Sequence, residues 1–204
     1  MTLDSFRPLA DRLMEPLIAG AKRVGLTPDS VSILAIVAAI GAGVSFYGAG
    51  ELRLLYLVGA VLVFLNGVLD LVDGGLAREL GTESAAGDLL DHVLDRYADL
   101  ILITGLAAGV GQYALGLAAV TGVLMTSYLG TQAQAVDLDR VYGGLLGRAD
   151  RLALMGVVTT IAAFVDVTAV ELTVVGWLLV VFAVVGHITA LQRFYYAMRA
   201  LSGE

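Results

Sequence analysis

The sequence predicts an all-α integral membrane protein with six transmembrane helices and an N-terminal amphipathic helix at the membrane interface. Three observations predict this fold class. The 204 residues are 58% hydrophobic and only 15% charged, and their mean hydropathy is +0.87. This composition is typical of integral membrane proteins and rare in soluble domains. Uncharged runs recur along the whole chain without internal repeats, so we expect a single domain over residues 1–204.

The first 27 residues predict the amphipathic helix. Charged residues separate apolar residues at roughly helical spacing, namely Leu3, Phe6, Leu9, Leu13, Leu17 and Ala21. This pattern is typical of a helix lying in the membrane interface, here broken or tilted by Pro8 and Pro16. An ordinary cytoplasmic helix that caps the bundle explains the pattern equally well.

Six spans follow from the uncharged runs, because a bilayer core needs about 20 apolar residues per helix. The run over residues 100–136 is too long for one crossing, and a turn at Gly111 and Gln112 divides it. We expect the second span to continue as a helix to about Ala77, and the sixth to about Ala200. The expected spans are residues 31–49, 54–69, 87–110, 113–131, 152–165 and 172–192.

The basic residues predict the orientation of these spans. With the N-terminus in the cytoplasm, only Arg53 falls outside, and Arg96 lies within a helix. Such a bias is the positive-inside pattern of membrane proteins. Both termini and the site described below are therefore expected to face the cytoplasm. The basic residues expected on that side are Arg7, Arg12, Lys22, Arg23, Arg78, Arg140, Arg148, Arg151, Arg193 and Arg199.

Four aspartates near one membrane boundary predict a metal site. Asp70 and Asp73 share one face of the second helix, and Asp91 and Asp95 share one face of the third. A charge in a membrane helix costs about 2.5 to 3.5 kcal/mol on insertion scales, so several are tolerated only when something offsets them. Carboxylate oxygens suit hard cations, Mg²⁺ or Mn²⁺. Four carboxylates can hold two such ions, an arrangement used in phosphoryl chemistry.

Two glycines and an arginine extend this prediction. Gly74 lies one turn after Asp70, and Gly87 one turn before Asp91. A helical glycine costs about 1 kcal/mol relative to alanine, which favours a bulky ligand lying close to the backbone. Arg78 is placed to bridge phosphate oxygens. For the glycines alone, close packing of membrane helices is the simpler explanation.

A family resemblance rests on these same residues. The stretch from Asp70 to Asp95 matches every fixed position of the pattern D-x2-D-G-x2-A-R-x8-G-x3-D-x3-D. In this it resembles the signature of the CDP-alcohol phosphotransferases. The stretch Thr27-Pro28-Asp29 also resembles the Thr-Pro-Asn of the family and departs from it at Asp29.

The resemblance implies an enzyme in which an acceptor hydroxyl attacks the lipid-linked phosphorus of a CDP-activated lipid and CMP leaves. It implies that Asp70, Asp73, Asp91 and Asp95 bind metal, with Asp95 also the general base. It further implies a CDP-binding pocket and a homodimer embedded in membrane lipid, and we expect no nucleic-acid partner. The residues implied for CDP binding are Asp70, Gly74, Ala77, Arg78 and Gly87.

The acceptor is predicted from three arginines. The stretch from Gly147 to Arg151 resembles the Glu-Arg-Ala-Asp-Arg of the inositol-phosphate-using branch, and Gln192-Arg193 resembles a Gln-Arg in its sixth span. Binding of a phosphorylated acceptor by Arg148, Arg151 and Arg193 is therefore expected, with inositol phosphate leading and glycerol phosphate the alternative. An unphosphorylated alcohol is less favoured. The branch has a lysine and an arginine where this chain has Gly130 and Gln132.

A function of another class, a cation transporter, also explains carboxylates within membrane helices. It does not explain Arg78, which would repel a cation. Anchoring at the membrane surface is the alternative explanation for the arginines before the fifth span.

Overall fold

The structure is a computed structural model that describes residues 7–138 and 144–202, with side chains from Leu13 onward. Its described part is all-helical apart from one small hairpin, as the sequence predicts. The helices are α1 (Arg7–Arg23), α2 (Pro28–Gly48), α3 (Leu55–Leu80), α4 (Ala85–Gly109), α5 (Tyr113–Gln132), α6 (Arg148–Phe164) and α7 (Val174–Leu201), with a 3₁₀ turn at Gln134–Val136. Strands β1 (Thr168–Ala169) and β2 (Leu172–Thr173) pair antiparallel.

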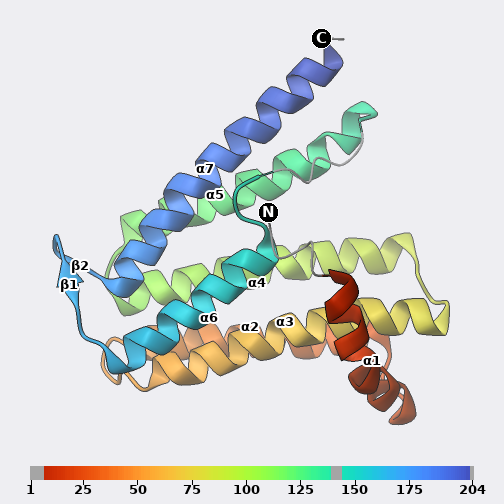
Figure 1. Cartoon of the computed structure of the whole chain (residues 1–204), viewed down its shortest axis with the longest axis horizontal. Helices are drawn as coiled ribbons and strands as arrows, with labels where there is room; N and C mark the ends of the chain where they lie inside the picture. Colours follow the sequence, from red (N-terminus) through yellow and green to blue (C-terminus); the bar gives the residue numbers. More distant parts are fainter. Residues whose placement is uncertain (1–6, 139–143, 203–204) are drawn as a thin grey trace.

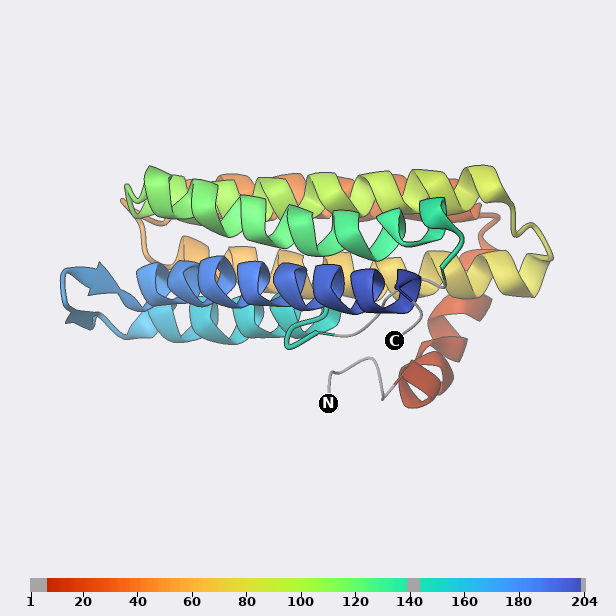
Figure 2. The ribbon, with the colours of Figure 1, turned by 90° about the horizontal axis from the view of Figure 1, so that it is seen from above.

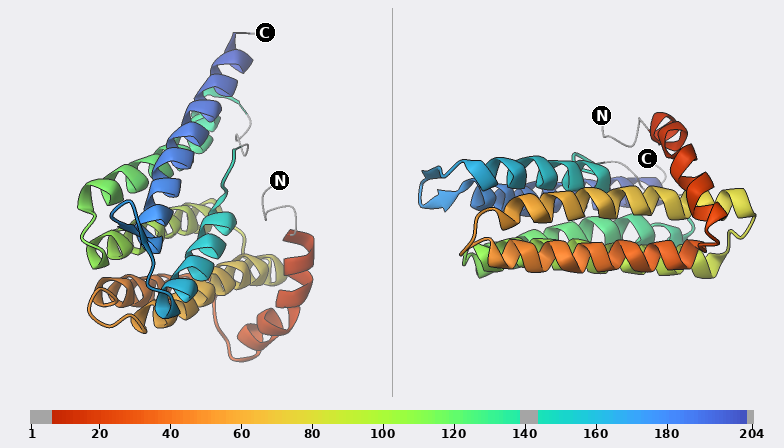
Figure 3. Two further views of the ribbon diagram at one scale, coloured as in Figure 1. Left: turned by 60° about the vertical axis from the view of Figure 1, so that its left-hand side comes forward. Right: turned by 90° about the horizontal axis from the view of Figure 1, so that it is seen from below.

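Helices α2 to α7 run side by side along one direction, and α1 crosses one end of this bundle (Figure 2). Helix α2 packs on α3 and α4, α3 packs on α6, and α5 packs on α7. Toward the end where α1 lies, the α5–α7 pair tilts away from the other helices (Figures 1 and 3). The β-hairpin lies at the opposite end (Figure 1).

Local sequence signals determine where the helices at the α1 end of the bundle begin and end. Thr27 caps α2, because its hydroxyl accepts the backbone N–H of Ser30 while the Ser30 hydroxyl accepts that of Thr27. Ser84 caps α4 by accepting the N–H of Gly87. Gly81 ends α3 in the left-handed conformation, with φ of +64°, which glycine adopts without strain. The last two caps determine where α3 ends and α4 begins, and these are the two helices that carry the site aspartates.

The core between α2 and α4 depends on glycines. A Cβ at Gly105 would overlap the backbone of Gly43, and a Cβ at Gly43 would lie 2.9 Å from the carbonyl oxygen of Ile101. The two backbones are therefore in direct contact, as is common where small residues line membrane helices. Next to this contact, Phe46 is fully buried and its ring fills the space beside Gly59 of α3.

Four helices are long and apolar enough to cross a membrane by length and composition: α2, α3, the segment Tyr113–Val136 and α7. Among the described residues α4 and α6 do not meet this criterion. Helix α4 carries the charged face of the site, and α6 has only 17 residues.

Several expected boundaries were displaced, among them the start of the first expected span, which lies at Pro28 rather than residue 31. The sixth span was expected from Leu172, but Leu172 and Thr173 form β2 and the helix begins at Val174, because Thr173 caps it by accepting the N–H of Gly176. The fifth begins at Arg148 rather than residue 152, so it includes Arg148 and Arg151, two of the three arginines expected to bind the acceptor. The second runs three residues past Ala77, to Leu80.

Helix α1 is continuous through Pro16 rather than broken there. Its Ile18 and Ala21 are buried in a small cluster with Val72 and Leu76 of α3, whereas Leu13 and Leu17 are exposed. Residues 1–6, with Leu3 and Phe6, and Arg140 lie outside the described residues. The side chains of Arg7, Pro8, Leu9 and Arg12 lie outside them as well.

Candidate active site

Three aspartates from two helices converge at the α1 end of the bundle. Asp70 comes from α3, and Asp91 and Asp95 come from consecutive turns of α4. One carboxylate oxygen of each lies within 4.8 Å of the others, and all three side chains are half-buried. This spacing and all-oxygen chemistry fit a divalent cation such as Mg²⁺ or Mn²⁺.

Asp73, the fourth expected metal ligand, lines the same small cavity as these three carboxylates. It is buried, and its Oδ2 accepts a hydrogen bond of 2.6 Å from the hydroxyl of Ser32 on α2. The structure therefore brings all four expected ligands to one cavity but holds Asp73 through a hydroxyl from a third helix.

Arg148, the first residue of α6, lines the same small cavity as this cluster. Its Nη1 lies 2.6 Å from Asp70 Oδ2 and 2.8 Å from Asp95 Oδ1, so one guanidinium bridges α3 and α4. Asn66 is buried one turn before Asp70, donates to the carbonyl of Ala35, and accepts a 3.5 Å contact from Arg148 Nη2.

Arg151, one turn further along α6, is buried and donates to Asp99 Oδ2 at 2.7 Å. Arg193 of α7 donates from Nη1 to the carbonyl oxygen of Thr126 on α5 at 2.7 Å. All three arginines expected to bind the acceptor line one groove, which also includes the aspartates of the cluster. Arg148 therefore lies directly beside the metal-site carboxylates Asp70 and Asp95, whereas Arg151 pairs with Asp99.

The residues expected to bind CDP line the same groove, on the part of α3 that follows Asp73 and the part of α4 that precedes Asp91. Gly74, Ala77, Arg78 and Gly87 are among its lining residues. An added Cβ at Gly74 would lie 3.6 Å from Arg78 Nη1, so the bare backbone at Gly74 adjoins a guanidinium. A diphosphate in this part of the groove could therefore contact the Arg78 guanidinium and the backbone at Gly74, which carries no side chain.

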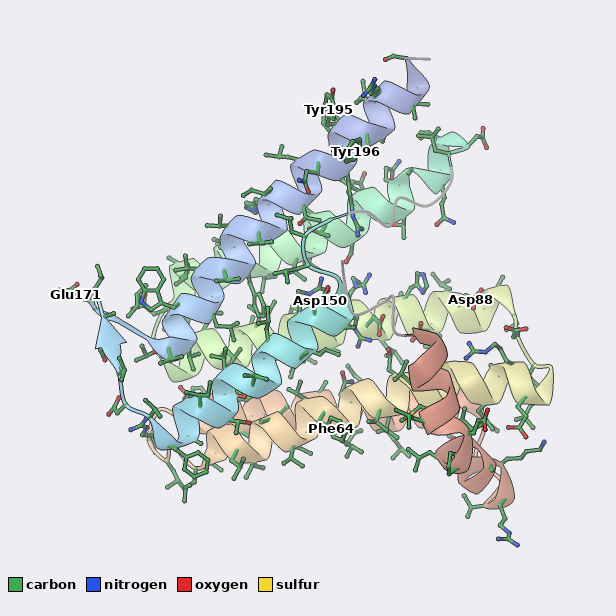
Figure 4. All side chains as sticks on the ribbon, in the orientation of Figure 1. Phe64, Asp88, Asp150, Glu171, Tyr195 and Tyr196 are labelled. Atoms are coloured by element: carbon green, nitrogen blue, oxygen red, sulfur yellow. The ribbon has the colours of Figure 1, made fainter. Side chains whose placement is uncertain are left out.

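The groove continues between α3 and α6 along apolar side chains. Val61, Phe64 and Val68 line it on α3, and Leu152 and Val157 line it on α6. Phe64, labelled in Figure 4, and Val157 are both exposed on the outer surface of the bundle. A polar cluster and an apolar channel therefore share one continuous groove.

The charges of the site are unbalanced without a cation. Five carboxylates gather here, on Asp70, Asp73, Asp91, Asp95 and Asp99. The guanidinium groups of Arg96, Arg148 and Arg151 face them. The five carboxylates outnumber these three guanidinium groups, an excess that a divalent cation would offset.

Sequence reasoning missed two contributors, Ser32 and Asn66. Both are polar residues in apolar runs, and Asn66 precedes Asp70 by one helical turn. The spacing of Asn66 was the one signal that was available, whereas the contact between Ser32 and Asp73 depends on how α2 and α3 are rotated against each other.

Residues 25–188 match the sequence profile described as CDP-alcohol phosphatidyltransferase. The chain belongs to this family. It is therefore a transferase of phospholipid biosynthesis and an integral membrane protein, and its Asp70, Asp91 and Asp95 offer the ligands for a divalent metal.

Relatives with assigned activities extend over nearly the whole chain. The archaetidylinositol phosphate synthase of Methanothermobacter thermautotrophicus is 30% identical over 200 residues, which cover 98% of this chain and 95% of the relative. The phosphatidylinositol phosphate synthase of Mycobacterium marinum is 32% identical over 192 residues, covering 90% and 79%.

Solved structures show the same fold. A crystal structure of the Mycobacterium tuberculosis phosphatidylinositol phosphate synthase with CDP-DAG bound matches with a TM-score of 0.77 and 27% identity, covering 91% of this chain and 94% of that one. A second structure of that enzyme, in complex with manganese and citrate, matches with a TM-score of 0.76 and 27% identity over 90% and 88% of the two chains.

Proposed function

We propose that this protein transfers a phosphatidyl or archaetidyl group from a CDP-linked lipid to inositol phosphate and releases CMP. The observation that carries the proposal is that Arg148 contacts Asp70 and Asp95 of the metal cluster, while Arg151 lines the same groove and pairs with Asp99. The arginines offer positive charge to a phosphorylated acceptor in the same groove where the carboxylates offer ligands to a cation. Its named relatives make phosphatidylinositol phosphate and archaetidylinositol phosphate.

In this proposal Asp95 is the general base. It accepts the proton of the acceptor hydroxyl as the hydroxyl oxygen attacks the lipid-linked phosphorus, and the bond to CMP breaks. Arg148 lies 2.8 Å from the Asp95 carboxylate and holds it in place. Phosphoryl transfer needs alignment and charge neutralisation more than covalent help, so a positioned base and cationic groups suffice.

The remaining site residues bind either the metal ions or the CDP-linked donor. Asp70, Asp73, Asp91 and Asp95 hold the divalent cations, which when bound neutralise charge on the diphosphate of the donor. Four carboxylates are enough to hold two such ions, the arrangement used in phosphoryl transfer. The CDP group lies against Asp70, Gly74, Ala77, Arg78 and Gly87, and the lipid chains enter the apolar part of the groove.

We further propose that α2 to α7 are six membrane spans of one domain covering residues 1–204. Both termini and the site then face the cytoplasm, and α1 lies at the interface through its exposed Leu13 and Leu17. The basic residues at the α1 end support this orientation. The family resemblance supports a homodimer.

The test measures CMP release in detergent with Mg²⁺ from two CDP-lipids, one carrying diacylglycerol and one archaeol. Inositol phosphate and glycerol phosphate are offered in parallel, and Asp95→Asn is the control. We expect release with inositol phosphate and at least a hundredfold loss in the variant, the range expected for a missing general base. Release only with glycerol phosphate would reassign the acceptor. No release from folded protein that binds Mn²⁺ would contradict the transferase reading and favour an ion pathway.

A further inference from the structure

Asp99 is the most deeply buried carboxylate of the site and lies outside the family signature. It is 1% exposed and sits on α4 one turn after Asp95, so it continues the face that carries the metal-site carboxylates. Its Oδ2 accepts the 2.7 Å hydrogen bond from Arg151. The proposed reaction assigns no role to the Asp99 carboxylate.

Asp99 is shared by three guanidinium groups. Besides Arg151, Nε of Arg148 lies 3.9 Å from its Oδ1, and Nε of Arg96 lies 3.9 Å from its Oδ2. Among the described residues, Nε of Arg148 and Nε of Arg151 have no hydrogen-bond partner. Asp99 therefore holds Arg151 by a hydrogen bond and lies within ion-pair distance of Arg148, without using all of the donors of these arginines.

Stability alone gives little reason for this arrangement. A buried ion pair is often no more stabilising than apolar residues of similar volume, because both charges must leave water. The same arginines are useful, however, if they must present charge at a fixed place. In addition, Asp99 is the third carboxylate within 4.0 Å of the Arg148 guanidinium, after Asp70 and Asp95. It remains a partner for Arg148 when the other two bind cations.

We infer that Asp99 is a positioning residue that holds the guanidinium groups of Arg148 and Arg151 where they bind the phosphate of the acceptor. This inference rests on the proposed function, which makes the acceptor a phosphorylated alcohol. When cations occupy Asp70 and Asp95, Asp99 is the carboxylate that still pairs with both Arg148 and Arg151, so positive charge on these two arginines is left to attract a phosphate dianion. Loss of Asp99 leaves the arginines charged but no longer fixed, so the acceptor site weakens while the donor and metal sites persist.

The experiment compares wild type with Asp99→Asn, Arg151→Gln and the double variant, all purified in detergent. The KM values for inositol phosphate and for the CDP-lipid, the kcat, and Mn²⁺ affinity by electron paramagnetic resonance are measured. We expect Asp99→Asn to raise the KM for inositol phosphate about tenfold or more, as for the loss of one partner of a buried charge pair. The KM for the CDP-lipid and the Mn²⁺ affinity should change by less than about threefold, below the effect of losing a group that orients metal ligands.

The double variant shows whether Asp99→Asn changes the KM for inositol phosphate by displacing Arg151 or only by removing a negative charge. If Asp99 acts through Arg151, the double variant should be no worse than Arg151→Gln alone, because coupled residues are not additive. Asp166→Asn is the matched control, since Asp166 pairs with Arg53 at 3.1 Å but lies beyond α6, next to the hairpin. It should behave as wild type.

An unchanged KM for inositol phosphate, or equal increases in both KM values, would overturn the inference. If Asp99→Asn does not fold, Asp99→Glu keeps the charge and moves the carboxylate by one methylene, and the same selective rise in the acceptor KM is expected. A wild type that releases no CMP with inositol phosphate would overturn the proposed function and this inference together. An active wild type with an unaffected variant would overturn this inference alone.

Discussion

Ser32→Ala tests how the protein holds Asp73. The Ser32 hydroxyl lies 2.6 Å from Asp73 Oδ2 and 3.2 Å from the carbonyl oxygen of Pro28, so its single proton goes to the nearer, charged acceptor. Both side chains are buried, which means that water does not replace the lost donor. A hydrogen bond to a charged group contributes about 1.5 to 3 kcal/mol. At 1.4 kcal/mol per tenfold, that is about 10- to 100-fold in affinity.

The assay is Mn²⁺ binding to the purified protein, followed by electron paramagnetic resonance. If Asp73 is a metal ligand, Ser32→Ala should weaken Mn²⁺ binding by about 10- to 100-fold, as losses of groups that orient metal ligands commonly do. Ser45→Ala is the matched control, because Ser45 lies on the same helix and donates only to the carbonyl oxygen of Gly41, at 2.8 Å. Equal Mn²⁺ affinities in the two variants would refute the assigned role of the Ser32 hydroxyl.

Three further predictions test packing, topology and the docking of α1. Gly105→Ala should lower the melting temperature in detergent because its Cβ overlaps the backbone of α2, whereas Gly20→Ala, with open space around it, should not. The chain has no cysteine, so single cysteines can be labelled specifically. With six spans, Glu171→Cys and Ser202→Cys should react with a membrane-impermeant thiol reagent from opposite sides of sealed vesicles. Labelling of both from the same side would contradict six spans. Lys22→Met should change stability by less than about 1 kcal/mol, because its ion pair with Glu79 is largely exposed; a larger loss of thermal stability would mean that the pair, rather than Ile18, docks α1.

The sequence predicted the helices well because their signals are local. Uncharged runs bounded by Gly111, Pro28 or charged clusters located each helix to within a few residues, and the regular spacing of the aspartates placed them on shared faces. The β-hairpin was missed because its two-residue strands carry no periodic pattern.

Contacts between helices were beyond sequence reasoning. The bridge from Arg148 to Asp70 joins residues 78 positions apart, and the Ser32–Asp73 bond joins residues 41 apart. Both depend on how each helix is rotated about its axis, which hydrophobic periodicity constrains only coarsely when a helix is apolar on all sides. The arginines of α6 were expected to meet the acceptor, but their pairing with the site carboxylates was not expected.

The charged face of α4 has a cost during membrane insertion. Two of the helices that carry the site, α4 and α6, are those that hydropathy does not identify as spans. A helix with several carboxylates inserts poorly alone, at about 2.5 to 3.5 kcal/mol per charge at its centre. If α4 spans the membrane as proposed, it depends on its neighbours to remain there, through the glycine contact with α2 and the arginines of α6. Neutral substitutions on this face would ease insertion while abolishing chemistry, so activity and biogenesis place opposite demands on the same side chains.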